Sequence, residues 1–119
     1  MTGLPTLSSV SGGFVVCLDS APNVCLFDNV GHLKAMYGGR PTPIHSAVHV
    51  AVTDAGFLLI LDADHQRIVM LDMELNHVVD VVAADHSLIE PRRLCWDDVN
   101  SRLFVSEAAG NVVVFELQP

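Results

Sequence analysis

The residues best suited to metal binding form one short run in the middle of the chain, Asp62-Ala63-Asp64-His65. Its carboxylates and imidazole are metal-ligand types, but the run has neither the spacing nor the terminal Glu of a calcium loop. His45 and His49 are four residues apart, which on a strand separates them by roughly 13 Å, too far to share one zinc ion. The sequence therefore predicts no metal site and no cofactor, and we interpret the acidic run as a solvated turn.

The candidate nucleophiles considered are Ser106, Cys95 and Cys17, and none lies in a G-x-S-x-G or comparable context. Cys17 and Cys25 lie inside apolar runs, where a free thiol usually behaves as a small buried hydrophobe. The chain has three cysteines and no close pairing motif, which predicts no disulfide framework and favours a reducing compartment such as the cytosol. We therefore expect no catalytic residues and a cytoplasmic location.

Acidic residues recur at one position of three similar segments, as Asp19, Asp62 and Glu107, with separations of 43 and 45 residues. A catalytic group is needed only once. A group that recurs in every repeat usually satisfies backbone donors in a turn. The recurrence therefore indicates a structural role for these acids.

The segments around these acids, 13–28, 56–72 and 102–116, share one pattern: an apolar run, an acid, a short polar turn, a second apolar run and a second acid. The runs are short, rich in Val and bounded by Gly, Asp and Asn, which favours strands over helices. A period in the low forties that contains several short strands is typical of four-stranded propeller blades.

Further strands complete this scheme, because an inner strand is expected before each pair and an outer strand after it. The expected inner strands are Leu7–Val10, Val48–Val52 and Arg93–Trp96, and the expected outer strands are His32–Tyr37 and His77–Val82. The third repeat ends before an outer strand. The sequence thus predicts an all-β partial β-propeller of about three four-stranded blades, the last lacking its outer strand. It forms a single unit over residues 1–119, with repeats at about 4–42, 43–90 and 91–119.

Continuous apolar runs at Phe57–Leu61 and Val112–Phe115 predict strands that are covered on both faces. The open sheet edge of the last blade and the outer faces of the end blades must be paired or capped. We therefore expect self-association, or pairing with the rest of a larger propeller, and the sequence leaves both open.

The repeats resemble NHL repeats. In the middle repeat the resemblance rests on Asp54–Phe57, Asp62, Gln66-Arg67-Ile68 and Leu71-Asp72, and in the last on Pro91-Arg92, Leu103–Val105 and Asn111–Glu116. The arginine of the repeat occurs only as Arg67. The chain looks most like the C-terminal propeller of tripartite-motif ubiquitin ligases. This resemblance implies a non-catalytic module that recruits substrate proteins, with any ligase activity in domains that this chain does not contain.

The charge balance bears on the partner, because the chain has a net charge of −8 and only six cationic residues. Nucleic-acid binding rests largely on Lys and Arg that neutralise phosphates, so the composition disfavours RNA. The chain also lacks the roughly 20 consecutive apolar residues of a membrane-spanning helix. Its start, Met1–Pro5, lacks the basic and apolar stretches of a signal peptide. We therefore expect no membrane association.

The loops between blades, 38–45 and 84–93, are expected to carry the binding surface together with the turns between second and third strands. The candidate binding residues on this face are Arg40, His45, Arg67, His86, Arg92 and Arg93. A protein partner is expected. An RNA-binding propeller, which some tripartite-motif relatives are, remains the alternative, although it requires a broad cationic surface or exposed aromatic residues for stacking.

Overall fold

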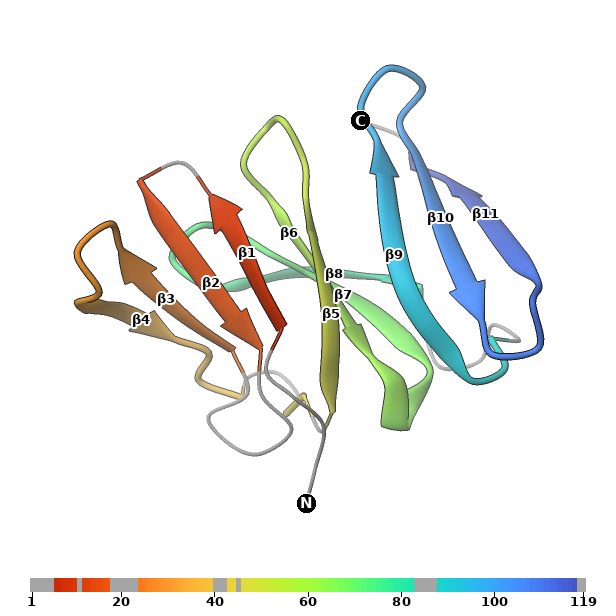
Figure 1. Ribbon diagram of the computed structural model, residues 1–119, viewed down its shortest axis with the longest axis horizontal. Helices are drawn as coiled ribbons and strands as arrows, with labels where there is room; N and C mark the ends of the chain where they lie inside the picture. The colour runs from red at the N-terminus through yellow and green to blue at the C-terminus, as the bar shows by residue number, and fades with distance from the viewer. Residues whose placement is uncertain are drawn as a thin grey trace.

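The computed structural model describes residues 6–10, 12–17, 24–39, 43–44, 46–82 and 88–117, which form three antiparallel sheets (Figure 1). The first sheet contains β1 (Thr6–Val10), β2 (Gly13–Cys17), β3 (Val24–Asp28) and β4 (Leu33–Met36). The second contains β5 (Ala47–Val52), β6 (Leu58–Asp62), β7 (Arg67–Leu71) and β8 (His77–Val82), with a 3₁₀ turn, Ala63–His65, between β6 and β7. The third contains β9 (Pro91–Asp97), β10 (Arg102–Glu107) and β11 (Val112–Glu116).

Within each sheet the strands are ordered as they follow in the chain, so every connection inside a sheet is a hairpin. The sheets have four, four and three strands in the described part of the chain. These findings confirm the predicted all-β fold of blade-like units. The predicted outer strand His77–Val82 has the bounds of β8 itself.

The three sheets are arranged around their first strands. Strand β5 lies between β1 and β9, while the first and third sheets lie to either side of the second (Figure 1). Strand β8 passes behind β6 and β7 in this view, so the second sheet runs away from the viewer. This arrangement is consistent with three consecutive blades whose inner strands meet at the centre.

Strand β6 shows why the second sheet is the core of the molecule, since all five of its residues are buried. Leu58 and Ile60 belong to the apolar cluster shared with the first sheet, whereas Leu59 and Leu61 belong to the cluster shared with the third. Successive strand residues point to opposite faces, so one strand supplies both interfaces. The prediction of a strand covered on both faces is confirmed here.

The same prediction is wrong for β11. Val113 and Phe115 pack against the second apolar cluster, but Val112 and Val114 on the other face are 59% and 48% exposed. The apolar run resembles that of β6, yet no described sheet packs against the far face of the third sheet. Burial on that face depends on a neighbour that the run of residues does not reveal.

The second repeated acid closes the hairpin between the third and fourth strands of a sheet. Asp28 Oδ1 accepts hydrogen bonds from the backbone N–H groups of Val30 and His32, at 3.0 and 2.8 Å. Asp72 Oδ1 accepts the equivalent bonds from Glu74 and Asn76, both at 2.9 Å. These local bonds explain why the chain turns back immediately after Asp28 and Asp72.

Candidate functional site

The first repeated acid has the structural role that its recurrence predicts. Asp62 is fully buried, and its Oδ1 accepts a 3.0 Å bond from the backbone N–H of Ser46, just before β5. Glu107 Oε2 accepts a 2.7 Å bond from the N–H of Ile89, just before β9. Asp62 and Glu107 thus fasten the segments that enter the second and third sheets. Their backbone donors lie in those segments and not in the adjoining turns, as was predicted. Asp19 lies outside the described residues.

Arg67 is a structural residue. Its side chain is 8% exposed, and its Nε donates to Asp62 Oδ2 at 3.0 Å. Its Nη2 donates to the carbonyl oxygen of Pro43 at 2.7 Å, and its Nη1 lies 3.5 Å from Asp80 Oδ2. Because the guanidinium is enclosed by these partners, Arg67 does not belong to the exposed binding face on which the sequence placed it.

In the acidic run around Asp62, only Asp62 is buried, whereas Asp64 and His65 are exposed in the 3₁₀ turn. His65 Nδ1 lies 3.1 Å from Asp62 Oδ2, the same oxygen that Arg67 uses. Within the residues that the structure describes, no group of three or more His, Cys, Asp or Glu side chains is arranged to hold a metal ion.

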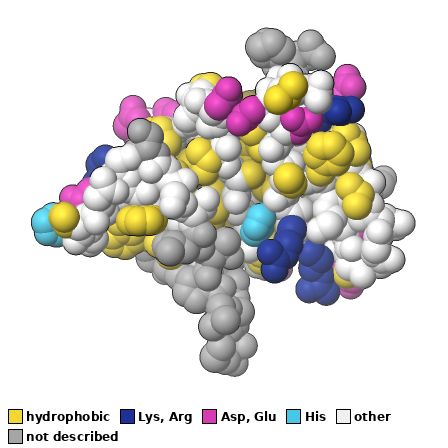
Figure 2. Space-filling model, turned by 45° about the horizontal axis from the view of Figure 1, so that its top comes forward, with side chains coloured by type: hydrophobic (Ala, Val, Ile, Leu, Met, Phe, Trp, Pro, Cys, Tyr) yellow, Lys and Arg dark blue, Asp and Glu magenta, His cyan; other side chains and the backbone are white. Residues whose placement is uncertain are grey.

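Arg92 and Arg93 are both exposed near the start of β9, whereas Arg40, His45 and His86 lie outside the described residues. Neighbouring His49 of β5 adds no charge to this pair. Its Nδ1 accepts a 2.9 Å bond from the N–H of Leu94, so that nitrogen carries no proton. Burial, followed by the charge of Arg93, lowers the pKa of His49. Figure 2 shows cationic side chains beside a histidine on this side of the molecule.

Burial also determines the chemistry of two cysteines. Cys17 and Cys25 are buried, as their apolar surroundings predict, while Cys95 is exposed. Burial, and secondarily the charge of Cys25, raises the pKa of the Cys17 thiol to about 12. Burial raises the pKa of Cys25 as well. These two thiols are therefore protonated at neutral pH and poor nucleophiles.

A pocket of about 440 Å³ lies between the second and third sheets, at the C-terminal ends of β5 and β9. Its large apolar side chains are Phe57, Met70, Trp96 and Leu117, and its remaining lining residues are Thr53, Asp54, Ala55 and Ser101. Two aromatic rings and a thioether therefore meet an exposed carboxylate in one hollow.

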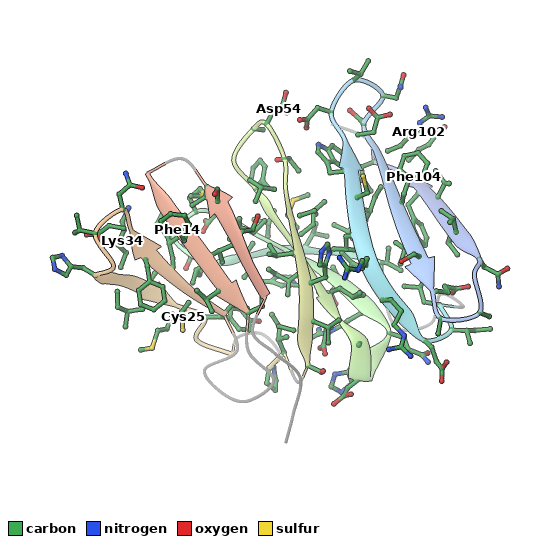
Figure 3. The ribbon with its side chains drawn as sticks, viewed as in Figure 1. Phe14, Cys25, Lys34, Asp54, Arg102 and Phe104 are labelled. Carbon is green, nitrogen blue, oxygen red and sulfur yellow. The ribbon has the colours of Figure 1, made fainter. Side chains whose placement is uncertain are left out.

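Two turns build this pocket and are joined by one carboxylate. Asp98 Oδ1, in the β9–β10 turn, accepts a 3.1 Å bond from the N–H of Asp54 in the β5–β6 turn. The same oxygen accepts a hydrogen bond from Trp96 Nε1, which fixes the indole ring. In Figure 3, Asp54 lies at the tip of its turn. Figure 2 shows acidic and hydrophobic side chains side by side along this upper edge.

Sequence reasoning missed this pocket and assigned its aromatic residues only to strands. Phe57 and Trp96 come from different repeats and are brought together only when the sheets pack. The local sequence gives no common signal, because Phe57 precedes β6 between Gly56 and Leu58, whereas Trp96 lies near the end of β9 beside Asp97. The sequence matches no known protein-family model and no curated protein. No helix in the described part of the chain has the length and apolar character needed to cross a membrane.

Proposed function

We propose that the chain is a non-catalytic protein-binding module of the NHL-propeller type, similar to the C-terminal propeller of tripartite-motif ubiquitin ligases. The repeated sheets and the recurring acids at equivalent strand ends support a repeat protein of this kind. In such a ligase its role is to recruit a substrate protein. The observation that carries the proposal is the apolar pocket with the carboxylate of Asp54 at its edge.

The pocket suits a cationic side chain with an apolar stem. Phe57 and Trp96 offer aromatic surface to which a Lys or Arg cation is attracted, and the stem of that side chain can pack on Met70. Asp54 is exposed at the rim, and the chain as a whole has a net charge of −8. This charge attracts a basic segment during encounter. The partner is therefore a protein segment with Lys or Arg next to apolar residues.

RNA binding is the competing function, and the described surface gives it less support. Arg92 and Arg93 are the two exposed arginines among the predicted binding residues that the structure describes. Trp96, the only tryptophan, is bonded to Asp98 and lies near Asp54. An RNA phosphate brought to this ring meets carboxylates of its own sign.

Selection of peptides from a random library on the purified chain tests the proposal. The selected peptides are then titrated, by fluorescence anisotropy, against the wild type, Asp54→Lys and Asp64→Lys. Both substitutions reverse one exposed acid, but Asp64 lies in the 3₁₀ turn between β6 and β7, away from the pocket.

We expect the selected peptides to contain Lys or Arg beside apolar residues. Affinity should fall at least about tenfold in Asp54→Lys, equivalent to about 1.4 kcal/mol, and stay unchanged in Asp64→Lys. Selected peptides without cationic residues, or with equal affinity for both variants, contradict the proposal.

A further inference from the structure

The two interfaces between sheets use equivalent positions. Val15 pairs with Leu26 in the first sheet, and Leu59 pairs with Met70 in the second, each 44 residues later. Val15 and Leu26 pack toward the second sheet, and Leu59 and Met70 pack toward the third. We call this side of each sheet its forward face, because it contacts the next sheet in chain order.

The opposite side of each sheet is its backward face, which contacts the preceding sheet. In the second sheet it carries Leu58, Ile60, Val69 and Leu71, which pack toward the first sheet. In the third sheet it carries Leu103, Val105, Val113 and Phe115, which pack toward the second. Forward and backward faces are thus complementary halves of one interface that occurs twice within the chain.

The forward face of the third sheet has no partner in the described part of the chain. Pairing of Phe104 with both Cys95 and Val114 places these three residues on it. Val112 and Val114 are 59% and 48% exposed, and Arg102 lies over the Phe104 ring at 5.8 Å. Figure 3 shows Arg102 and Phe104 on this sheet.

The backward face of the first sheet is likewise uncovered by any described residue. Phe14 pairs with Phe27, and Cys25 pairs with Val16 and Met36, which places all five side chains on this face. Phe14 is 36% exposed and Met36 is 53% exposed. An apolar sheet face of this kind marks an interaction site when it is contiguous.

We propose that these two faces bind each other between two copies of the chain. The forward face of the third sheet in one copy packs on the backward face of the first sheet in the second copy. A twofold axis repeats this contact, so that two copies with three sheets each close a ring of six. The partner is a second copy because one free face is a forward face and the other is a backward face. Forward and backward faces already pack on each other twice within the chain.

Symmetry and size agree with this closure. Twofold dimers are the commonest protein oligomers, and propellers contain typically four to eight blades. The ring leaves no end sheet with an exposed face. In Figure 1 the first and third sheets lie at opposite sides of the molecule, where both faces can reach a second copy at the same time.

Light scattering over a dilution series of the whole chain tests the proposal, with Phe14→Glu and Val114→Glu as variants of the two faces. Val30→Glu is the matched control, because Val30 is 75% exposed in the β3–β4 turn and belongs to neither face. We expect the wild type and Val30→Glu to have twice the chain mass of 12.8 kDa. Each face variant should be a folded monomer by circular dichroism.

Mixing the two monomeric variants provides a second test, because each retains the face that the other has lost. The mixture should regain dimer through one intact contact. The Cys95 thiol should also react more slowly in concentrated wild type than in Val114→Glu, since the dimer covers it. A folded wild-type monomer at every concentration overturns the proposal, as does a dimer that both face variants leave intact.

Discussion

The carboxylate of Asp62 and the guanidinium of Arg67 form a buried pair, with 3.0 Å between Oδ2 and Nε. Each partner also holds the segment that enters β5. Asp62 accepts the N–H of Ser46, and Arg67 donates to the carbonyl of Pro43. One ion pair therefore fastens the connection between the first and second sheets to the strands that follow it.

Removing one partner of this pair should be costly, because the other charge stays buried without compensation. We expect Arg67→Ala or Asp62→Ala to lower the free energy of unfolding by about 3–5 kcal/mol in urea denaturation. Asp64→Ala removes an exposed acid two residues from Asp62 and should change the free energy of unfolding by less than about 0.5 kcal/mol. Equal effects at the two acids contradict the structural role of Asp62.

Acid should destabilise the fold through the turn-capping acids. The backbone N–H groups of Asn76 and His32 lower the pKa values of Asp72 and Asp28 below the ordinary 3.8. A lowered folded pKa contributes stability above the unfolded pKa, and this contribution is lost as the pH falls through the folded pKa. Asp72→Asn keeps an acceptor oxygen without a titrating charge, so its urea midpoint should fall less steeply below pH 3.8 than that of the wild type. Urea midpoints that fall equally steeply with pH in the wild type and in Asp72→Asn contradict this role of Asp72.

Two residues with left-handed backbone should respond oppositely to glycine. Gln66 has φ 51° and is exposed, so Gln66→Gly should raise the free energy of unfolding by about 1 kcal/mol at most. Leu75 has φ 64° but is buried in the first apolar cluster. Leu75→Gly should lower stability by about 2 kcal/mol or more, because the lost burial exceeds the relieved strain. Chemical denaturation of both variants checks these signs, and stabilisation by Leu75→Gly contradicts the argument.

Much of the fold was predictable because strand signals are local. The apolar runs that end in Asp62 and Asp72 predicted β6 and β7, since a short apolar run bounded by turn residues favours a strand. Burial was harder to predict from the sequence, because it depends on which sheets pack against each strand. The run at β11 reads like that of β6, but only β6 has a sheet on each side. Arg67 was misplaced for the same reason, since its partner Asp80 comes from another strand.

RNA affinity is expected to be weak. Filter binding of single-stranded RNA should show no submicromolar complex, and Arg92→Ala/Arg93→Ala should change the result little. The physical reason is the net charge of −8, against which two exposed arginines form a small patch. Tight binding that weakens steeply with salt and disappears in the double variant favours the RNA-binding alternative.

The most direct measurement of the central claim uses Trp96, the only tryptophan, which lines the pocket. A peptide obtained by selection on the wild type is titrated while tryptophan emission is recorded. We predict a saturable change in emission for the wild type and Asp64→Lys, shifted to at least about tenfold higher peptide concentration in Asp54→Lys. Peptide binding that leaves Trp96 emission unchanged, or that is unaffected by Asp54→Lys, contradicts the claim that this pocket is where the module binds its protein partner.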